Sequence, residues 1–261
     1  MSSKAKSITE TLPQEMMRHT YSILYEVEES HWWYTGRRRI IASFVERICD
    51  EIKGDSRPHI LDIGCGTGAN LLLLSQFGDA EGVDISEDAI AFCRKRGLLN
   101  VRQGAAEKLP YEDKTFDLIT SFDVVEHLDD DVAGLSEMRR VLRPNGRILL
   151  FVPTFMFLWG VQDEVSNHRR RYRLPELRVA VEKAGFEIER MTYANITFFL
   201  PVLLIRKFMR LTGLRAATEN SINISALDGL FGRVFGAESR LLRYMNLPFG
   251  VSGLCVARRI E

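Results

Sequence analysis

The chain has 261 residues, of which 46% are hydrophobic, enough for one buried core with an additional cap. Its 35 Lys and Arg balance its 35 Asp and Glu, so no overall field attracts nucleic acid, and we predict no nucleic-acid partner. The four cysteines lack CxxC or metal-ligand spacing, which favours reduced thiols. The polar beginning does not resemble a signal peptide, and no apolar run reaches the roughly 20 residues of a membrane span, so we expect a cytoplasmic protein.

Two helices are predicted ahead of the first strand, and an aromatic and basic segment joins them. Apolar residues recur at helical spacing over 16–27, and a second helix is expected over 37–52. The joining segment, 31–39, reads HWWYTGRRR. It is either a buried aromatic staple beside a solvated helix start, or a lid over a carboxylate or phosphate, which arginine binds through two parallel hydrogen bonds. We assign residues 1–57 to an N-terminal helical lid.

From residue 58 the sequence alternates regularly between short apolar strands and helices. This alternation predicts an α/β fold with a parallel, doubly wound sheet. A long loop is expected over 153–173, and the stretch 195–249 interrupts the alternation before the last strand. Strands are expected at 59–63, 79–84, 100–103, 116–121, 147–153, 186–193 and 252–257, helices at 69–74, 86–96 and 174–184, and a turn at 142–146.

The first of these strands ends in LDIGCGTG, a turn with glycines at positions 64, 66 and 68. Glycine accepts positive φ and has no Cβ, so the N–H groups of such a turn can face a polar ligand. Asp84 ends the next strand, where a carboxylate in this topology faces the ribose of a nucleoside. These features alone suit either a nicotinamide dinucleotide or S-adenosylmethionine (SAM).

Three details favour SAM. Asp62 stands two residues before Gly64, where dinucleotide folds carry apolar side chains but a charged amino-acid group requires a carboxylate. The glycine spacing is G-x-G-x-G and not the G-x-G-x-x-G of dinucleotide sites. The third strand is followed by GAAEKLP, residues 104–110. A nicotinamide oxidoreductase stays as an alternative.

Five segments resemble, in order, the motifs of class I SAM-dependent methyltransferases of the group called type 11. They are LDIGCGTG, EGVDIS, GAAEKLP, FDLITSFDVVEHL and RRVLRPNGRILLFVP, all within 59–153. The resemblance implies a seven-stranded, mostly parallel Rossmann-like methyltransferase sheet with an antiparallel last strand. It also implies SAM as cofactor and S-adenosylhomocysteine as product. Ala105 is a departure, because the family usually has an aspartate there.

The resemblance further implies how the cofactor site is divided. The three glycines approach the methionyl part, Ala105 and Ala106 flank the adenine, and Phe122 or Asp123 lies beneath the cofactor. No NPPY-type tetrapeptide follows the fourth strand, which argues against amide or adenine-amine acceptors. The predicted cofactor-binding residues are Trp33, Arg37, Asp62, Gly64, Cys65, Gly66, Gly68, Asp84, Ile85, Ala105, Ala106 and Phe122.

Transfer of a methyl group to a hydroxyl is helped by a general base, and histidine is the usual choice near neutral pH. His168 lies in the 153–173 loop and is the first candidate, with His127 and Asp123 as further catalytic candidates. The alternative is that His168 only caps its loop. The arginines at 169–171 either form a solvated strip or anchor an anionic acceptor.

A divalent metal is a second hypothesis for the same region. Ubiquinone-biosynthesis O-methyltransferases carry a carboxylate followed by a Glu-His pair that holds such an ion, and Asp123, Glu126 and His127 resemble it. A hard cation there would acidify an acceptor hydroxyl. Because metal-free relatives share the Glu-His pair, we prefer the site without metal. Residues 129–131, three aspartates, indicate a solvated helix start.

The stretch 195–249 is interpreted as a helical cap, inserted between a SAM-binding core at 58–194 and a final strand at 250–261. Its apolar run, 196–205, is too short to span a bilayer. Together with the nearby Arg206, Lys207 and Arg210 it also suits a peripheral membrane contact, and a dimer surface would have the same composition.

We therefore expect a SAM-dependent methyltransferase that acts on a small molecule, at an oxygen of a sugar, a lipid-linked glycan or a quinone-like compound. The expected acceptor is anionic or lipid-linked, and the protein is a monomer or homodimer, cytoplasmic or peripheral at the membrane. An N-methyltransferase of a small amine and a catalytically silent SAM-binding regulator are the alternatives.

Overall fold

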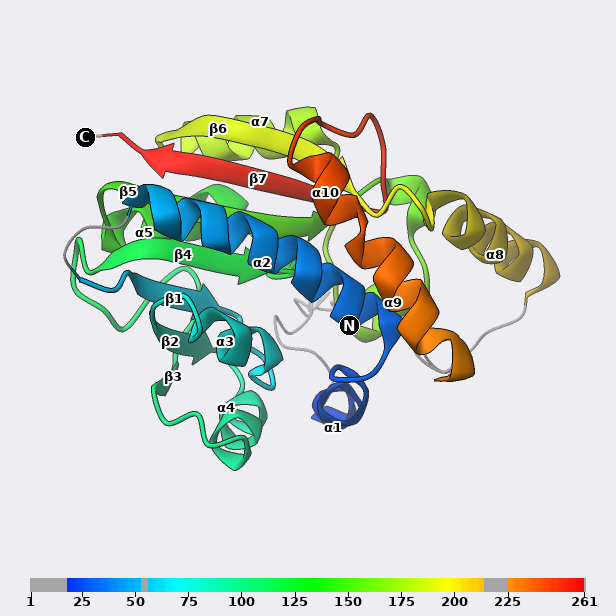
Figure 1. Cartoon of the computed structure of the whole chain (residues 1–261), viewed down its shortest axis with the longest axis horizontal. Helices are drawn as coiled ribbons and strands as arrows, with labels where there is room; N and C mark the ends of the chain where they lie inside the picture. Colours follow the sequence, from blue (N-terminus) through cyan, green and yellow to red (C-terminus); the bar gives the residue numbers. More distant parts are fainter. Residues whose placement is uncertain (1–17, 53–55, 214–224, 261) are drawn as a thin grey trace, which may run out of the picture.

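A computed structural model describes residues 18–52, 56–213 and 225–260, and at its centre lies one seven-stranded sheet (Figure 1). The strand order is β3-β2-β1-β4-β5-β7-β6. Neighbours from β3 to β5 are parallel, whereas β7 is antiparallel to β5 and to β6. This arrangement confirms the predicted sheet, including its antiparallel last strand. The strands are β1 His59–Ile63, β2 Asp79–Asp84, β3 Val101–Gln103, β4 Phe116–Phe122, β5 Leu142–Pro153, β6 Phe186–Ala194 and β7 Ser252–Arg259.

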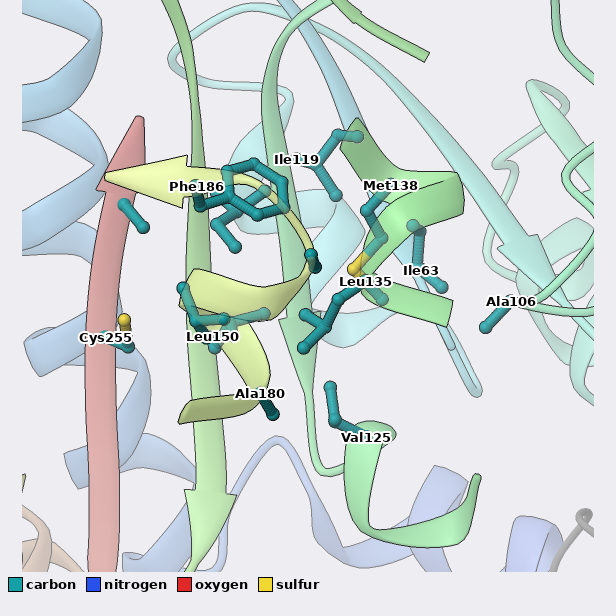
Figure 2. Packing of buried hydrophobic residues seen from close by; sticks show 14 of the residues in the cluster. Ile63, Ala106, Ile119, Val125, Leu135, Met138, Leu150, Ala180, Phe186 and Cys255 are labelled. Carbon is teal, nitrogen blue, oxygen red and sulfur yellow. The ribbon is translucent and has the colours of Figure 1, made fainter. Parts of the chain in front are cut away.

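The central strands are apolar on both faces because helices cover both faces of the sheet. Successive side chains point to opposite sides, so Ile119 and Leu150 pack on one face while Leu118 and Leu149 pack on the other. Figure 2 shows the first of these clusters, in which Leu135 and Met138 of one helix and Ala180 of another meet the sheet. Continuous burial explains why the strands are readable as short unbroken apolar runs.

The helices form two layers around the sheet. The α5 and α7 helices supply the cluster in Figure 2, and α2, α9 and α10 cover the opposite face. The helices are α1 Arg18–Val27, α2 Trp32–Ile52, α3 Ala69–Leu74, α4 Glu87–Lys95, α5 Asp131–Val141, α6 Val161–Val165, α7 Leu174–Lys183, α8 Phe199–Thr212, α9 Asp228–Gly236 and α10 Glu238–Leu242; short 3-10 turns are η1 Val125–His127, η2 Met156–Leu158 and η4 Ser225–Leu227.

Three predicted boundaries were wrong. The α2 helix begins at Trp32 and not at Arg37, so the aromatic segment is helical. The β5 strand begins at Leu142, so it includes the turn predicted at 142–146. Within this segment Asn145 has a φ of +63°, which interrupts the regular strand conformation. The expected loop over 153–173 contains η2 and the short helix α6.

Contacts between segments distant in sequence hold α2 against the late insertion. The N–H of Trp32 donates to Asp228 Oδ1 at 3.0 Å, and Arg39 Nη1 donates to the carbonyl of Gly232 at 2.9 Å. At Gly36 a side chain would not fit, because a Cβ would lie 2.7 Å from the ring of Phe235. The α2 and α9 helices therefore pack as one unit, side by side in Figure 1.

Other features of the sequence analysis can be compared with the described residues. All four cysteines are buried free thiols, as predicted. Within the described parts of the chain, no helix is long and apolar enough to cross a membrane. Parts of the predicted lid and insertion, namely 1–17, 53–55 and 214–224, lie outside the described residues, as does residue 261.

Candidate functional site

A cavity of about 370 Å³ opens at the carboxyl ends of β1 and β4. These strands are neighbours at the point where the strand order reverses, which is where ligands bind in open α/β sheets. The glycine turn after β1 and the residues Phe122 and Asp123 at the end of β4 line its floor. Residues of α1, α2 and α8 line its remaining sides, so both the N-terminal helices and the insertion contribute to it.

The glycine turn is held by Asp84 at the end of β2. Asp84 is buried, and its two carboxylate oxygens accept hydrogen bonds from the N–H groups of Gly66 and Ser86, each at 2.9 Å. Gly64 and Gly66 have φ of +68° and +55°, values that glycine adopts without strain. The turn and the carboxylate thus form one structure that faces the cavity.

Gly64 and Gly66 allow a matched test of this turn. A Cβ at Gly64 would lie 2.2 Å from Cγ2 of Val124, whereas a Cβ at Gly66 would meet nothing within 4 Å. We expect Gly64→Ala to lower the free energy of unfolding by roughly 2–5 kcal/mol, through backbone strain and overpacking together. Gly66→Ala should cost only about 1–2 kcal/mol, the strain alone. Urea denaturation measures both, and equal losses would contradict this account.

Arg37 enters the cavity from α2. Its guanidinium is buried, forms an ion pair with Asp123 and lies over the ring of Phe151, 4.5 Å from the centroid. Among the described residues, Nε and Nη2 of Arg37 have no hydrogen-bond partner. Buried unpaired donors beside a cavity suit an anionic ligand group such as a carboxylate.

Asp62 lies beneath the turn and is almost completely buried. It accepts a hydrogen bond from Thr120 Oγ1 at 2.7 Å, and it is not among the described residues that line the cavity. Burial, with the nearby charge of Asp84, raises the pKa of Asp62 to about 7 despite the Thr120 hydrogen bond. Near neutral pH this carboxyl is therefore poised between its two protonation states.

The raised pKa of Asp62 predicts a dependence of stability on pH. Protonated Asp62 favours the folded state, so its contribution is complete below about pH 4 and is lost as the pH rises through about 7. Relative to Asp62→Asn, the wild type should lose a few kcal/mol of unfolding free energy across this interval. Urea denaturation at a series of pH values measures the difference. A difference that does not change with pH would contradict the assignment, and the exposed Asp79, changed to Asn, is the control.

The helix α1 is attached to the outer side of the glycine turn. Glu28 accepts hydrogen bonds from Thr67 Oγ1 and from Arg96 Nη2, the latter at 2.7 Å, and Arg96 also donates to the carbonyl of Thr67 at 2.8 Å. Burial raises the pKa of Glu28 even though Thr67 and Arg96 oppose the shift. This contact was not predicted from the sequence, because Glu28 and Thr67 are 39 residues apart.

His168 lines the cavity, and Asp163 of α6 holds it. Nδ1 of His168 lies 2.8 Å from Asp163 Oδ1, and its backbone N–H donates to the Asp163 carbonyl at 2.9 Å. Burial alone would raise the pKa of Asp163, but hydrogen bonds from His168 and the charge on Arg171 hold it below its usual range. An ionised Asp163 fixes the proton of His168 on Nδ1 and leaves Nε2 as an acceptor.

Glu126 and His127 lie against His168. The rings of His127 and His168 meet edge to face with centroids 4.7 Å apart, and Glu126 Oε1 is 3.8 Å from Nε2 of His168. Burial, together with the neighbouring His168 and Arg169, lowers the pKa of His127 to about 3, so this imidazole is neutral. Burial and the charge of Asp123 raise the pKa of Glu126 well above its usual range.

Among the described residues, Glu126, His127 and His168 form a group that could hold a metal ion. Their ligand atoms lie within 4.8 Å of one another. The set differs from the predicted one, because His168 joins Glu126 and His127 while Asp123 pairs with Arg37. Both carboxylate oxygens of Glu126 and Nδ1 of His127 lack hydrogen-bond partners within the described chain. The donor set, one carboxylate and two imidazoles, suits a divalent cation.

The three arginines after His168 point in different directions. Arg169 and Arg170 form ion pairs with Asp129 and Asp131 at 2.8 and 3.0 Å, so the three aspartates at 129–131 are partly a docking site for this loop. Arg171 is buried, pairs with Asp163 at 2.7 Å and lines the cavity. Of the three, only Arg171 faces the site.

Most predicted site residues come together at the cavity, and a few lie outside its lining. Gly68 packs against Leu98 and Cys93 at the start of α3, and Ala105 forms a bridge with Lys108. Gly104 and Thr67 line the cavity but were not predicted. The predicted residues that line it are Trp33, Arg37, Gly64, Cys65, Gly66, Asp84, Ile85, Ala106, Phe122, Asp123, His127 and His168.

Comparison with known proteins agrees with this geometry. Residues 61–150 match the family described as methyltransferase domain, in its type 11 group. A demethylmenaquinone methyltransferase of Symbiobacterium thermophilum is 32% identical over 194 residues, covering 70% of this chain and 74% of that protein. A Mycolicibacterium smegmatis protein assigned as a SAM-dependent methyltransferase is 32% identical over 166 residues, and the chain spans 62% of its length.

Solved structures agree in fold. A Galdieria sulphuraria protein assigned as a sarcosine dimethylglycine methyltransferase superposes with a TM-score of 0.56 at 16% identity, over 86% of each chain. A Haemonchus contortus phosphoethanolamine N-methyltransferase, solved with S-adenosylhomocysteine, gives 0.52 at 18% identity over 80% of this chain and 51% of that one. The fold is that of the Rossmann-like methyltransferases. The chain belongs to the class I SAM-dependent methyltransferases of the type 11 group.

Proposed function

We propose that this protein transfers the methyl group of SAM to an oxygen of a small-molecule acceptor, with His168 as the general base. The observation that supports this most directly is one cavity lined both by the glycine turn with Asp84 and by His168, which Asp163 holds.

The residues of the cavity fit the parts of SAM. Asp84 has the position at the end of β2 that accepts from ribose hydroxyls, and Gly66 leaves open space beside it. The free donors of Arg37 are suited to the methionyl carboxylate. Once bound, the sulfonium supplies an activated methyl group for in-line displacement.

His168 is suited to receive the acceptor's proton. Asp163 orients its ring and stabilises the imidazolium that forms, as the carboxylate does in other histidine bases. Neutral His127 packs against the ring and restricts its movement. The surrounding aromatic and aliphatic side chains exclude water, which protects the alignment of donor and acceptor.

The acceptor class follows from the other side of the cavity. Val202, Ile205 and Met209 of α8 present an apolar wall, while Arg171 and Arg206 add positive charge. Such a site suits a molecule with an apolar part and a hydroxyl near His168, for example a lipid-linked sugar or a quinone-like compound. Several relatives are named demethylmenaquinone methyltransferases, which is compatible with a quinone-like acceptor.

Two alternatives have specific support. The phosphoethanolamine N-methyltransferase among the structural neighbours favours transfer to an amine. The cluster Glu126, His127 and His168 favours activation of the acceptor by a divalent metal. We expect catalysis without a metal, so activity should survive prolonged treatment with a chelator. Loss of activity that Mg²⁺ or Mn²⁺ restores would favour the metal.

Calorimetry and a transfer assay test the proposal in order. S-adenosylhomocysteine should bind with an affinity at least tenfold above that for NAD. Isotope-labelled SAM should then pass label to a member of a panel of quinols, polyprenol-linked sugars and amines, and mass spectrometry locates the methylated atom. Preferential binding of NAD would refute the SAM site. Binding of S-adenosylhomocysteine without transfer to any acceptor would favour a silent SAM-binding protein, and labelled nitrogen would favour the amine.

A further inference from the structure

The helix α8 is apolar on two opposite sides. Val202 and Met209 face the cavity together with the buried Arg206. At 3.6 residues per turn, Leu200, Leu204, Phe208 and Leu211 fall within an arc of about 80° on the other side of the helix. We call these four residues the outer face of α8. Their side chains are between 56 and 77% exposed, although a helix that is apolar all round is normally buried.

Further exposed apolar side chains lie at the first turn of α8, on the side of Phe199 and not on the outer face. The exposed Phe157 of η2 has its ring 6.3 Å from that of Phe199, which in turn lies 5.0 Å from the ring of the exposed Phe249. Met156, beside Phe157, is exposed as well. Figure 1 shows α8 projecting from one end of the molecule, away from the sheet. Apolar surface of this extent marks a site of association.

The helix is held firmly in this position. Arg206 donates to the carbonyl of Leu158 and lies 3.8 Å from Asp163 Oδ2, and Arg210 donates to the carbonyl of Trp159. Glu238 accepts from the N–H groups of Asn195 and Thr197 at 2.7 and 2.8 Å and so fixes the entry to α8. The exposure of the outer face is therefore a property of a well-anchored helix.

The exposed charges of the insertion indicate what its partner is. Throughout the described residues of 195–250, every exposed charged side chain is basic, although the chain as a whole carries no net charge. Of the described acidic residues there, Glu238 is buried and Asp228 is half-buried, and both accept backbone hydrogen bonds. The exposed basic residues are Lys207, Arg210, Arg233, Arg240 and Arg243.

We infer that the outer face of α8 docks on the surface of an anionic lipid bilayer. Leucine and phenylalanine enter the headgroup and acyl boundary, and exposed basic residues of the insertion, of which Lys207 lies next to the outer face on α8, contact anionic headgroups. A second copy of the chain fits less well, because a two-fold contact would bring the same basic residues against each other.

Docking in this orientation would place the acceptor cavity beside the bilayer. Ile205 lines the cavity and is also exposed next to the outer face. An acceptor with a lipid chain could pass along Ile205 from the membrane to the site while its chain stays in the lipid. This second step rests on the proposed function, whereas docking itself does not depend on methyl transfer.

Vesicle flotation with the full chain tests the docking. The protein should float with vesicles of phosphatidylcholine and phosphatidylglycerol, and much less with phosphatidylcholine alone or at high salt. The double variant Leu204→Glu with Phe208→Glu should reduce partition on the order of 100-fold, because two apolar anchors become charges. The milder Leu204→Ala with Phe208→Ala should reduce it by roughly tenfold. Binding of S-adenosylhomocysteine checks that each variant is folded.

A matched control variant replaces two exposed apolar residues with glutamate outside the insertion. Leu99 and Val179 are exposed apolar residues after α4 and on α7, and Leu99→Glu with Val179→Glu adds the same charge outside the insertion. This variant should float like the wild type. Equal loss in both double variants, or no flotation of the wild type with anionic vesicles, would overturn the inference. The inference would also be overturned if light scattering showed a dimer that only the α8 variant dissociates. A second copy of the chain, and not a bilayer, would then cover the outer face.

Discussion

Replacing Asp84 with alanine is expected to reduce the affinity for S-adenosylhomocysteine at least roughly 100-fold, because the proposed ribose contact to a charged acceptor is lost together with two hydrogen bonds that hold the glycine turn. The carboxylate fixes the N–H of Gly66 and the N–H of Ser86, so its removal releases the turn as well as the proposed ribose contact. Isothermal titration calorimetry measures the affinity.

Asp79 provides the control for this change. It lies at the opposite end of the same strand, is exposed and forms only a surface ion pair with Arg57 at 3.4 Å. Asp79→Ala should bind S-adenosylhomocysteine like the wild type, and Asp84→Asn, which keeps one accepting oxygen, should be intermediate. An affinity of Asp84→Ala within a few-fold of the wild type would show that the turn does not depend on the carboxylate.

His168→Ala is expected to lower kcat by about 10²- to 10⁴-fold, the usual contribution of a general base. Binding of S-adenosylhomocysteine should change little, because the contacts of His168 are with Asp163 and His127 and not with the glycine turn. Rates with labelled SAM and the identified acceptor measure the loss. His59→Ala, at the start of β1, is the control and should keep its turnover. Unchanged turnover of His168→Ala would remove His168 as the base.

Asp163 should act through His168 as a positioning residue. Asp163→Asn is expected to lower kcat more than it changes KM for SAM and to move the acid limb of the kcat profile to lower pH, because the charge that stabilises the protonated imidazole is lost. A purely structural role, such as the hydrogen bond from the N–H of Gly160 to Asp163, would not move that limb. An unshifted profile with reduced activity would therefore assign Asp163 to the fold alone.

The sheet could be predicted because its signals are local. Each strand is a short apolar run between glycine, proline or polar residues, and burial on both faces keeps the run unbroken, as with Leu118 and Ile119. The glycine turn is local for the same reason, since its three glycines and Asp84 follow from one strand-turn-helix-strand unit. These elements carry most of the cofactor side of the cavity.

The remaining errors come from contacts between distant segments. The first turn of α2 is aromatic, and aromatic residues are only moderate helix formers, so no local signal marks where the helix begins. Its start is capped by Asp228, 196 residues away, and Trp32 packs on Phe198 and Phe231 of the insertion. Similarly, Glu28 reaches Thr67 only after the sheet has folded. Spacing along the chain cannot reveal such partners.

The acceptor side of the cavity was predicted only in part, because the orientation of its residues depends on contacts that have no local signal. His168 was identified by its residue type in a loop that leaves a strand end, but its orientation depends on Asp163 in a helix of only five residues. So short a helix has almost no periodic signal of its own. The metal candidates shifted for a similar reason, because Asp123 is engaged by Arg37 from a different part of the chain.

The close packing of α2 on α9 has a kinetic consequence. Gly36 and Gly232 allow the two helices to approach until side chains of one meet the other's backbone, and the Trp32 to Asp228 hydrogen bond locks their ends. A movement of α2 that uncovers the glycine turn must therefore carry α9 and the start of the insertion with it. The rate at which the cofactor side of the cavity opens would then depend on the insertion as well as on α2.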